Sequence, residues 1–85
     1  MPADGGPAHV YLLRCTDGSL YCGWTTDLDR RLAEHGTGSA SRYTRSRLPV
    51  ELAWSAPMTS RAEALREEAR IKRLTRAEKM RLLEG

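Results

Sequence analysis

The sequence lacks any long hydrophobic run: no stretch of its 85 residues approaches the roughly 18–20 apolar residues that span a bilayer. Its first residues also lack the basic segment and the apolar stretch of a secretory signal. We therefore expect a cytoplasmic protein without membrane association. A chain of this length supports one compact core, which excludes a multidomain enzyme or a large barrel. We predict a flexible N-terminal lead-in over residues 1–8 and a single domain over residues 9–85.

Cysteines and the common catalytic motifs are scarce as well. The chain has two cysteines, Cys15 and Cys22, and without a secretory signal we expect both thiols to be reduced. There is no glycine-rich phosphate loop with a lysine, no CxxC pair, no HExxH and no GxSxG. The sequence therefore gives no support for a P-loop nucleotide hydrolase, a zinc protease or an α/β-hydrolase.

Lysine is rare among the cations, because only Lys72 and Lys79 contribute to the 14 Lys and Arg residues. The formal net charge is +3. Guanidinium groups bind phosphate oxygens in a bidentate fashion, so a mildly basic chain rich in arginine suits a polyanionic partner. A compositional bias of the genome toward arginine explains the same numbers equally well.

The first half of the domain predicts a β-hairpin. Residues 9–15 and 19–24 are rich in β-forming side chains, and Thr16-Asp17-Gly18 separates them. We expect a three-residue loop with Gly18 in the left-handed conformation, which pairs Tyr11 with Gly23 across the strands. In this register the cysteines lie on opposite faces, which argues against a disulfide between them. The core face then carries Val10, Leu12, Leu20, Cys22 and Trp24.

The rest of the chain predicts three helices and one more strand. Thr26-Asp27-Leu28-Asp29 has the capping oxygens and acids of a helix start, and this helix is expected to stop at Gly36. Residues 36–48 form a polar, basic loop, and alternation over residues 50–56 predicts a third strand. Two capping boxes begin the final helices, at Ser60 and Thr75. The order β-β-α-β-α-α indicates an α+β domain with a small three-stranded antiparallel sheet and helices packed around it.

Four candidate side chains lie on the second face of the hairpin and on the edge of the first helix. Tyr11 and Tyr21 are diagonal neighbours there, and Gly23 opposite Tyr11 leaves room for a ligand. Plain aromatic packing is the alternative for the tyrosines. Arg31 and His35 lie one turn apart beside the apolar stripe, where they can reach a site next to the sheet. The alternative is an extended Arg31 with its charge in solvent and a His35 that pairs with the helix dipole.

One glutamate of the helix that begins after Ser60 differs from the others. On a helical wheel Glu68 falls within the apolar arc of Ala64, Leu65 and Ile71, whereas the neighbouring glutamates fall on the solvated side. A carboxylate in that position needs a cation or hydrogen bonds. The wheel leaves two interpretations open: a functional carboxylate, or a partly buried glutamate paired with an arginine.

The loop over residues 36–48 mixes arginines with one aromatic residue. Basic side chains interleaved with an aromatic ring suit a nucleic-acid backbone with a stacked base, and a solvated connector is the alternative. The candidate nucleic-acid contacts are Arg42, Tyr43, Arg45 and Arg47 of this loop, with Lys72 of the later helix.

The ordered spacing of these residues resembles a known family. Val10-Tyr11-Leu12 is followed by Tyr21-Cys22-Gly23, with ten residues from one tyrosine to the next, and Arg31 comes ten residues after Tyr21. This set is similar to the GIY-YIG nuclease domain, and more narrowly to small stand-alone bacterial GIY-YIG proteins, over nearly the whole chain. The resemblance implies a GIY-YIG-like fold with Glu68 as the metal ligand. The catalytic residues that it implies are Tyr11, Tyr21, Arg31 and His35.

By this resemblance the protein is expected to be an endonuclease that hydrolyses DNA, or else RNA, with a divalent metal, Mg²⁺ or Mn²⁺, as cofactor. A lone carboxylate suits Mg²⁺, which keeps most of its waters. Tyr11 or else His35 would accept the proton of the attacking water, and Arg31 would hold the phosphate.

Two departures from the family favour an alternative. Trp24 replaces a lysine of the related repair nucleases, and the chain contains no asparagine, which those enzymes carry after the glutamate. The alternative is a nucleic-acid-binding module of the same fold with weak, partner-dependent or no cleavage. A third hypothesis, an adaptor that docks an acidic protein, rests only on the arginine-rich helices.

Overall fold

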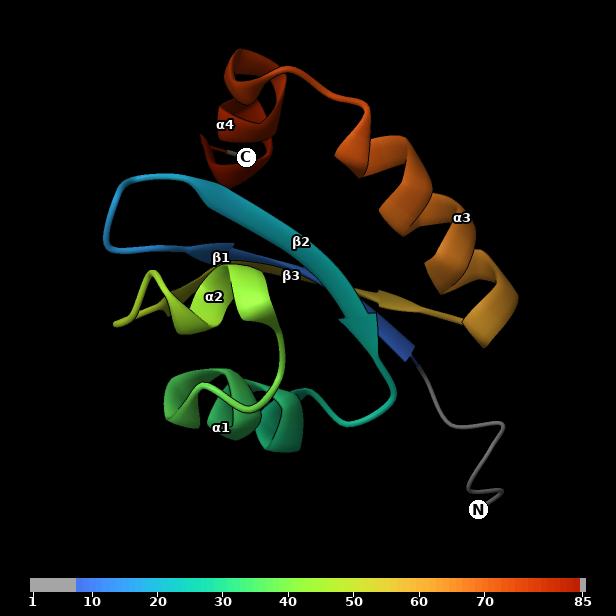
Figure 1. Ribbon diagram of the computed structural model, residues 1–85. Coiled ribbons are helices and arrows are strands. Elements are labelled where there is room, and N and C mark those ends of the chain that lie inside the picture. The colour runs from blue at the N-terminus through green and yellow to red at the C-terminus, as the bar shows by residue number, and fades with distance from the viewer. Residues whose placement is uncertain (1–7, 85) are drawn as a thin grey trace.

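The computed structural model describes residues 8–84 and shows a three-stranded antiparallel sheet between two layers of helices (Figure 1). The strand order is β2-β1-β3, so β2 is an edge strand. Helices α1 and α2 cover one face of the sheet, and α3 and α4 cover the other (Figure 1). The elements are β1 (Ala8–Arg14), β2 (Leu20–Thr25), α1 (Leu28–Thr37), α2 (Arg42–Arg45), β3 (Glu51–Met58), α3 (Arg61–Lys72) and α4 (Arg76–Glu84).

This architecture confirms the predicted α+β domain. The order β-β-α-β-α-α holds, with the short helix α2 as an addition. β1 begins at Ala8, one residue before the predicted start, and the rest of the expected lead-in, residues 1–7, lies outside the described residues. No helix within residues 8–84 combines the length and apolar character that a membrane crossing requires.

The β1–β2 turn has the predicted geometry. Gly18 adopts a φ of 85°, the Cys15 amide donates to the Ser19 carbonyl over 2.9 Å, and Tyr11 pairs with Gly23. The Asp17 carboxylate accepts hydrogen bonds from the Ser19 amide at 3.0 Å and the Ser19 hydroxyl at 2.6 Å. Because a slip of one residue would exchange the two faces of the hairpin, this turn decides which side chains face the core.

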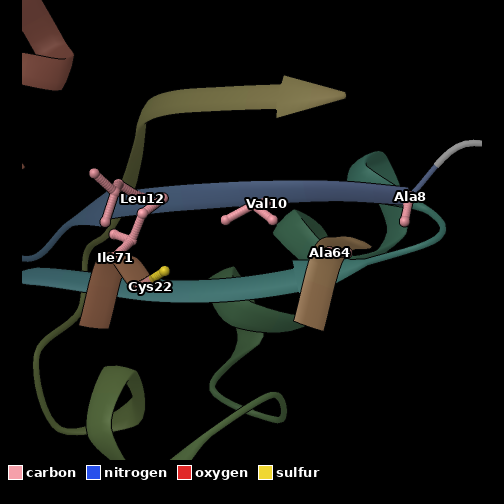
Figure 2. Close-up of a cluster of buried hydrophobic side chains, with 6 residues drawn as sticks. All are labelled: Ala8, Val10, Leu12, Cys22, Ala64 and Ile71. Carbon is pink, nitrogen blue, oxygen red and sulfur yellow. The ribbon is translucent and has the colours of Figure 1, made fainter. Parts of the chain in front are cut away.

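The hydrophobic core lies between the sheet and α3 (Figure 2). Leu20 and Trp24 pack against it half-buried, so the predicted core face is confirmed. Burial of one valine, leucine or isoleucine side chain stabilises the fold by about 1.5–3 kcal/mol, which makes this layer the main source of hydrophobic stability. The opposite face of the sheet buries Tyr11 and Leu13 together with the polar residues His35 and Thr44. The buried cluster consists of Ala8, Val10, Leu12, Cys22, Ala64 and Ile71.

Two local predictions between residues 36 and 48 are wrong. Helix α1 does not stop at Gly36 but continues to Thr37, and Gly38 ends it with a φ of 83°. Only Gly38 adopts the left-handed conformation that reverses the chain, so Gly36 stays helical. The expected loop contains α2, because the Ser41 hydroxyl accepts a hydrogen bond from the Thr44 amide over 3.1 Å and caps this short helix.

Candidate active site

Tyr11 and His35 form a buried hydrogen-bonded pair between β1 and α1. Tyr11 Oη lies 2.8 Å from His35 Nε2, and the two residues are 1% and 0% exposed. The other ring nitrogen, His35 Nδ1, lies 2.9 Å from Thr44 Oγ1. Thr44 Oγ1 in turn lies 3.0 Å from Ser41 Oγ. A chain of four polar groups thus runs from the sheet through α1 to the start of α2, and both nitrogens of the buried imidazole have partners.

Gly23 determines where the phenol of Tyr11 can lie. A Cβ atom on Gly23 would be 2.5 Å from Tyr11 Oη and 2.6 Å from Tyr11 Cζ. The space that a side chain would occupy is therefore filled by the phenol from the neighbouring strand. The expectation that Gly23 leaves room for a ligand is wrong, because Tyr11 itself takes that room.

Arg31 adds a positive charge beside this pair. Its guanidinium pairs with Glu34 at 3.0 Å, and its side chain is 36% exposed. Burial raises the pKa of Tyr11, and the nearby Arg31 guanidinium opposes that rise. Burial lowers the pKa of His35, and the charge of Arg31 lowers it further. His35 is therefore a neutral imidazole at neutral pH, which can accept a proton at one nitrogen.

Tyr21 extends the cluster toward α2. Its ring centroid lies 5.4 Å from that of His35 in an edge-on arrangement and 5.5 Å from that of Tyr43 in a stacked one. The Arg47 guanidinium carbon lies 3.9 Å from the centroid of the Tyr43 ring, and Arg47 Nε donates to Asp17 Oδ2 over 2.9 Å. Tyr43 and Arg47 already have partners within the protein, so a base that stacks on Tyr43 has to displace one of them.

The predicted nucleic-acid contacts divide between two sides of the sheet. Arg42 and Arg45 are exposed on α2, next to Tyr43 and Arg47. Lys72 belongs to α3 and forms an ion pair with Glu68 at 3.3 Å. Because α2 and α3 cover opposite faces of the sheet (Figure 1), Lys72 is separate from the other four.

Glu68 lies across the edge strand from the tyrosines. Its side chain is 18% exposed, and within the described residues its ion-pair partner is Lys72, one helical turn on, not the arginine considered from the sequence. Glu68 faces inward, as the helical wheel predicted. Of the expected apolar arc, however, only Ala64 and Ile71 are buried, and Leu65 is 49% exposed.

Cys22 points from β2 toward the helix that carries Glu68. Burial raises the pKa of the Cys22 thiol to about 11, and the nearby Glu68 carboxylate contributes to that rise. Cys22 stands between Tyr21 and Gly23, and its side chain points into the core between the sheet and α3. Glu68 belongs to α3, so it and Tyr21 lie on opposite faces of the sheet (Figure 1).

The available donors suit a hydrated magnesium ion better than zinc. Within residues 8–84 no three His, Cys, Asp or Glu side chains gather as a ligand cluster, whereas a zinc site needs three or four protein ligands. Mg²⁺ keeps several waters and binds through one or two carboxylates. The half-buried Glu68 fits that role as a single protein ligand, and Lys72 competes for the same carboxylate.

Thr44 is the residue of this site that the sequence did not reveal. It is fully buried and is the partner of His35 Nδ1, yet in the sequence it is one hydroxyl among several in an arginine-rich segment. The spacing of three residues from Ser41, a helix-capping residue, is the one local signal that could have indicated a buried threonine.

Protonation of His35 should make the fold less stable in mildly acidic solution. Because burial lowers its pKa in the folded state, the unfolded chain takes up a proton first as the pH falls. Above the ordinary pKa of 6.5 the titration of this residue does not change the free energy of unfolding with pH, and below it that free energy should decrease until the folded pKa is reached. Urea unfolding of the wild type and His35→Gln over a series of pH values measures the effect. An equal pH dependence in both proteins would exclude His35 as its source.

Known proteins are similar to this chain in both sequence and fold. Residues 7–81 match the family model of the GIY-YIG catalytic domain. A UPF0213 protein of Streptococcus agalactiae is 51% identical over 74 residues, which are 87% of this chain and 84% of that protein. A UPF0213 protein of Halobacterium salinarum is 51% identical over 71 residues, which are 84% of this chain and 92% of that protein.

A solved structure agrees with these matches. The solution NMR structure of a UPF0213 protein from Bacillus halodurans superimposes with a TM-score of 0.60 at 42% identity, over 92% of this chain and 83% of that one. The names of these relatives specify neither a substrate nor an activity. The findings confirm the predicted resemblance and the fold.

Proposed function

Because this chain belongs to the GIY-YIG catalytic domain family, whose members are generally endonucleases, we propose that it hydrolyses phosphodiester bonds of DNA with a divalent metal. The observation that supports this proposal most directly is the contact of 2.8 Å between Tyr11 Oη and His35 Nε2, with Arg31 beside it. A phenol, a neutral imidazole and a guanidinium together provide a proton acceptor and a charge that can neutralise a phosphate.

Tyr11 is the proposed acceptor of the proton from the attacking water. For that role its own proton passes to His35 Nε2, which is neutral and within hydrogen-bond distance. A ring that accepts at Nε2 carries its hydrogen on Nδ1, and Thr44 Oγ1 is placed to receive it. Because the lowered pKa of His35 disfavours a retained imidazolium, the Nδ1 proton passes to Thr44 Oγ1 as the Thr44 hydroxyl proton passes to Ser41 Oγ. The partly exposed Ser41 hydroxyl then releases its own proton to solvent.

Arg31, Tyr21 and Glu68 have the remaining roles. Arg31 is half-exposed, so its guanidinium can bind the non-bridging oxygens of the scissile phosphate while it stabilises the Tyr11 phenolate. Tyr21 orients the phosphate or the water next to Gly23. Glu68 would hold a hydrated metal ion, which when bound would neutralise charge on the phosphate and support the leaving oxygen. The substrate would lie over the edge strand β2, which Tyr21 and Glu68 flank.

Nicking of a supercoiled plasmid tests the proposal. The wild type should convert the plasmid to open circles with Mg²⁺ or Mn²⁺ and should stop when EDTA removes the metal. Tyr11→Phe removes only the hydroxyl, so we expect the nicking rate to fall at least about 10²-fold, the typical size of a general-base effect.

Tyr43→Phe is the matched control for Tyr11→Phe. It removes the hydroxyl of the neighbouring tyrosine and keeps the ring that stacks on Tyr21, so its nicking rate should equal that of the wild type. Equal rates for Tyr11→Phe and the wild type would exclude Tyr11 as the proton acceptor. Nicking in EDTA would exclude the metal dependence.

A nucleic-acid-binding module with weak or no cleavage is the second candidate. The observation that favours it is the burial of Tyr11 and His35, because a water must reach Tyr11 Oη before it can attack. The ion pair between Glu68 and Lys72 favours it as well, since it occupies the proposed metal ligand. Salt-dependent DNA binding without nicking at any Mg²⁺ or Mn²⁺ concentration would select this candidate over the nuclease.

A further inference from the structure

A cleft at the end of β2 is lined by three arginines, of which the proposed mechanism uses one. The cleft has a volume of about 410 Å³, and its cations are Arg30 and Arg31 of α1 and Arg61, the first residue of α3. Because α1 and α3 cover opposite faces of the sheet (Figure 1), the cleft passes around the edge of the sheet. Trp24 contributes an apolar wall.

The acids of this cleft already have partners. Asp27 Oδ1 accepts a hydrogen bond from the Arg30 amide over 3.2 Å and caps α1. Glu34 pairs with Arg30 at 3.3 Å and with Arg31 at 3.0 Å. The exposed side chain of Arg61 forms no hydrogen bond or ion pair with any residue of the 8–84 segment. A guanidinium has five N–H donors, so all three arginines keep donors for a ligand and Arg61 keeps all of its own.

We propose that this cleft binds the substrate strand beside the scissile bond, with Arg61 and Arg30 on the phosphates that neighbour the one at Arg31. Arg31 lies in the cleft and also beside Tyr11, so a strand anchored there for cleavage has to continue past the other two arginines. Guanidinium groups bind phosphate oxygens in a bidentate fashion. This inference rests on the proposed function, because it takes nucleic acid as the substrate.

The cleft is a better backbone site than the arginine-rich segment around α2. There Arg47 is engaged by Asp17 and Tyr43, and Tyr43 by Tyr21, so binding to these two would first have to break contacts within the protein. Arg42 and Arg45 are exposed, and within the described residues their side chains form no hydrogen bond or ion pair, so they are as available as Arg61. The cleft differs because it also holds Arg31, which lies beside Tyr11. We therefore assign the main backbone contact to the cleft.

Fluorescence anisotropy with a labelled DNA duplex in EDTA, where cleavage is blocked, tests the assignment. One phosphate contact contributes about one unit to the slope of log Kd against log salt. Arg61→Ala should therefore weaken binding about 5- to 10-fold near 0.1 M salt and reduce that slope by about one. Arg61→Lys, which keeps the charge, should retain the wild-type slope.

Arg66→Ala is the matched control, since Arg66 is exposed on the same helix outside the cleft. It should bind DNA like the wild type, and circular dichroism should show equal helix content in both alanine variants. Equal affinities for Arg61→Ala and Arg66→Ala would overturn the inference, as would a loss of affinity confined to a variant with Arg42 and Arg45 both changed to alanine.

The outcomes also separate this inference from the proposed nuclease activity. If the wild type nicks DNA and Arg61→Ala binds and nicks DNA equally well, the cleft is not the binding site for the strand, and the proposed nuclease activity is unaffected. If Arg61→Ala binds DNA more weakly and the wild type does not nick it, the cleft is supported as a binding site and the proposed nuclease activity is excluded. A wild type that binds no DNA in low salt would remove both.

Discussion

Glu68→Ala should reduce metal-dependent nicking by about 10²-fold or more, because it removes the half-buried carboxylate that is the proposed metal ligand. The loss should come from the metal and not from the fold. The ion pair with Lys72 is half-exposed on the lysine side, and such pairs contribute at most about 1 kcal/mol to stability. Plasmid nicking over a range of Mn²⁺ concentrations measures the activity, and the electron paramagnetic resonance of free Mn²⁺ measures metal binding.

Glu67→Ala is the control for this variant. Glu67 is the preceding residue of the same helix, and its carboxylate accepts two hydrogen bonds from the Arg70 guanidinium, at 2.9 and 2.6 Å, so its removal should leave both nicking and Mn²⁺ binding unchanged when Glu68 is the ligand. If Glu68→Ala nicks as fast as the wild type, either another group holds the metal or a contaminating nuclease is being measured. Mn²⁺ binding separates the two: equal nicking together with unchanged Mn²⁺ binding would exclude Glu68 as the ligand.

Among the described glycines, Gly23 is the one at which an added methyl group meets the closest contact, so Gly23→Ala should lower the stability of the fold. The new Cβ would lie 2.5 Å from Tyr11 Oη, and overpacking of this kind costs about 1–3 kcal/mol. Displacement of the phenol would also leave His35 Nε2 without its partner, and a buried unsatisfied polar group costs about 1–3 kcal/mol more. Urea unfolding should show the lower stability, and plasmid nicking should fall with it.

Gly36→Ala is the same type of substitution as Gly23→Ala, but we expect it to increase the stability of the fold. Gly36 lies inside α1, and apart from its chain neighbours and the backbone of the helix no atom of the described residues lies within 4 Å of the position of its Cβ. Alanine there should raise the free energy of unfolding by up to about 1 kcal/mol, because glycine is the weaker helix former. If Gly23→Ala unfolds at the same urea concentration as the wild type, Tyr11 does not occupy the space against Gly23 and the arrangement of the site is wrong.

Local physics accounts for the parts of the site that could be predicted from the sequence. The register that pairs Tyr11 with Gly23 follows from Gly18 and from the alternation of apolar residues on either side of it. The start of α3 follows from Ser60, whose hydroxyl accepts the Glu63 amide hydrogen bond over 3.1 Å. These signals act within a few residues, where backbone geometry and hydrogen bonding leave few options.

The sequence also predicted that Glu68 faces the interior of the protein, but it could not predict where Glu68 lies relative to the tyrosines. Helical periodicity says which side of α3 faces the protein, and it says nothing about which face of the sheet that helix covers. In the structure α3 covers the face opposite α1 (Figure 1). Glu68 and Tyr21 therefore approach β2 from different sides, an outcome set by how the whole chain packs.

The sequence by itself determined the strands, the hairpin register and the face on which Tyr11 and Tyr21 lie. Only the tertiary structure decided which distant residues come together. Tyr11 forms a hydrogen bond with His35, 24 positions along the chain, Thr44 forms a hydrogen bond with the same histidine, and Arg61 and Arg31 line one cleft. The physical reason is range: propensity, capping and alternation act between near neighbours, whereas contacts between distant residues depend on the packing of complete helices against the sheet.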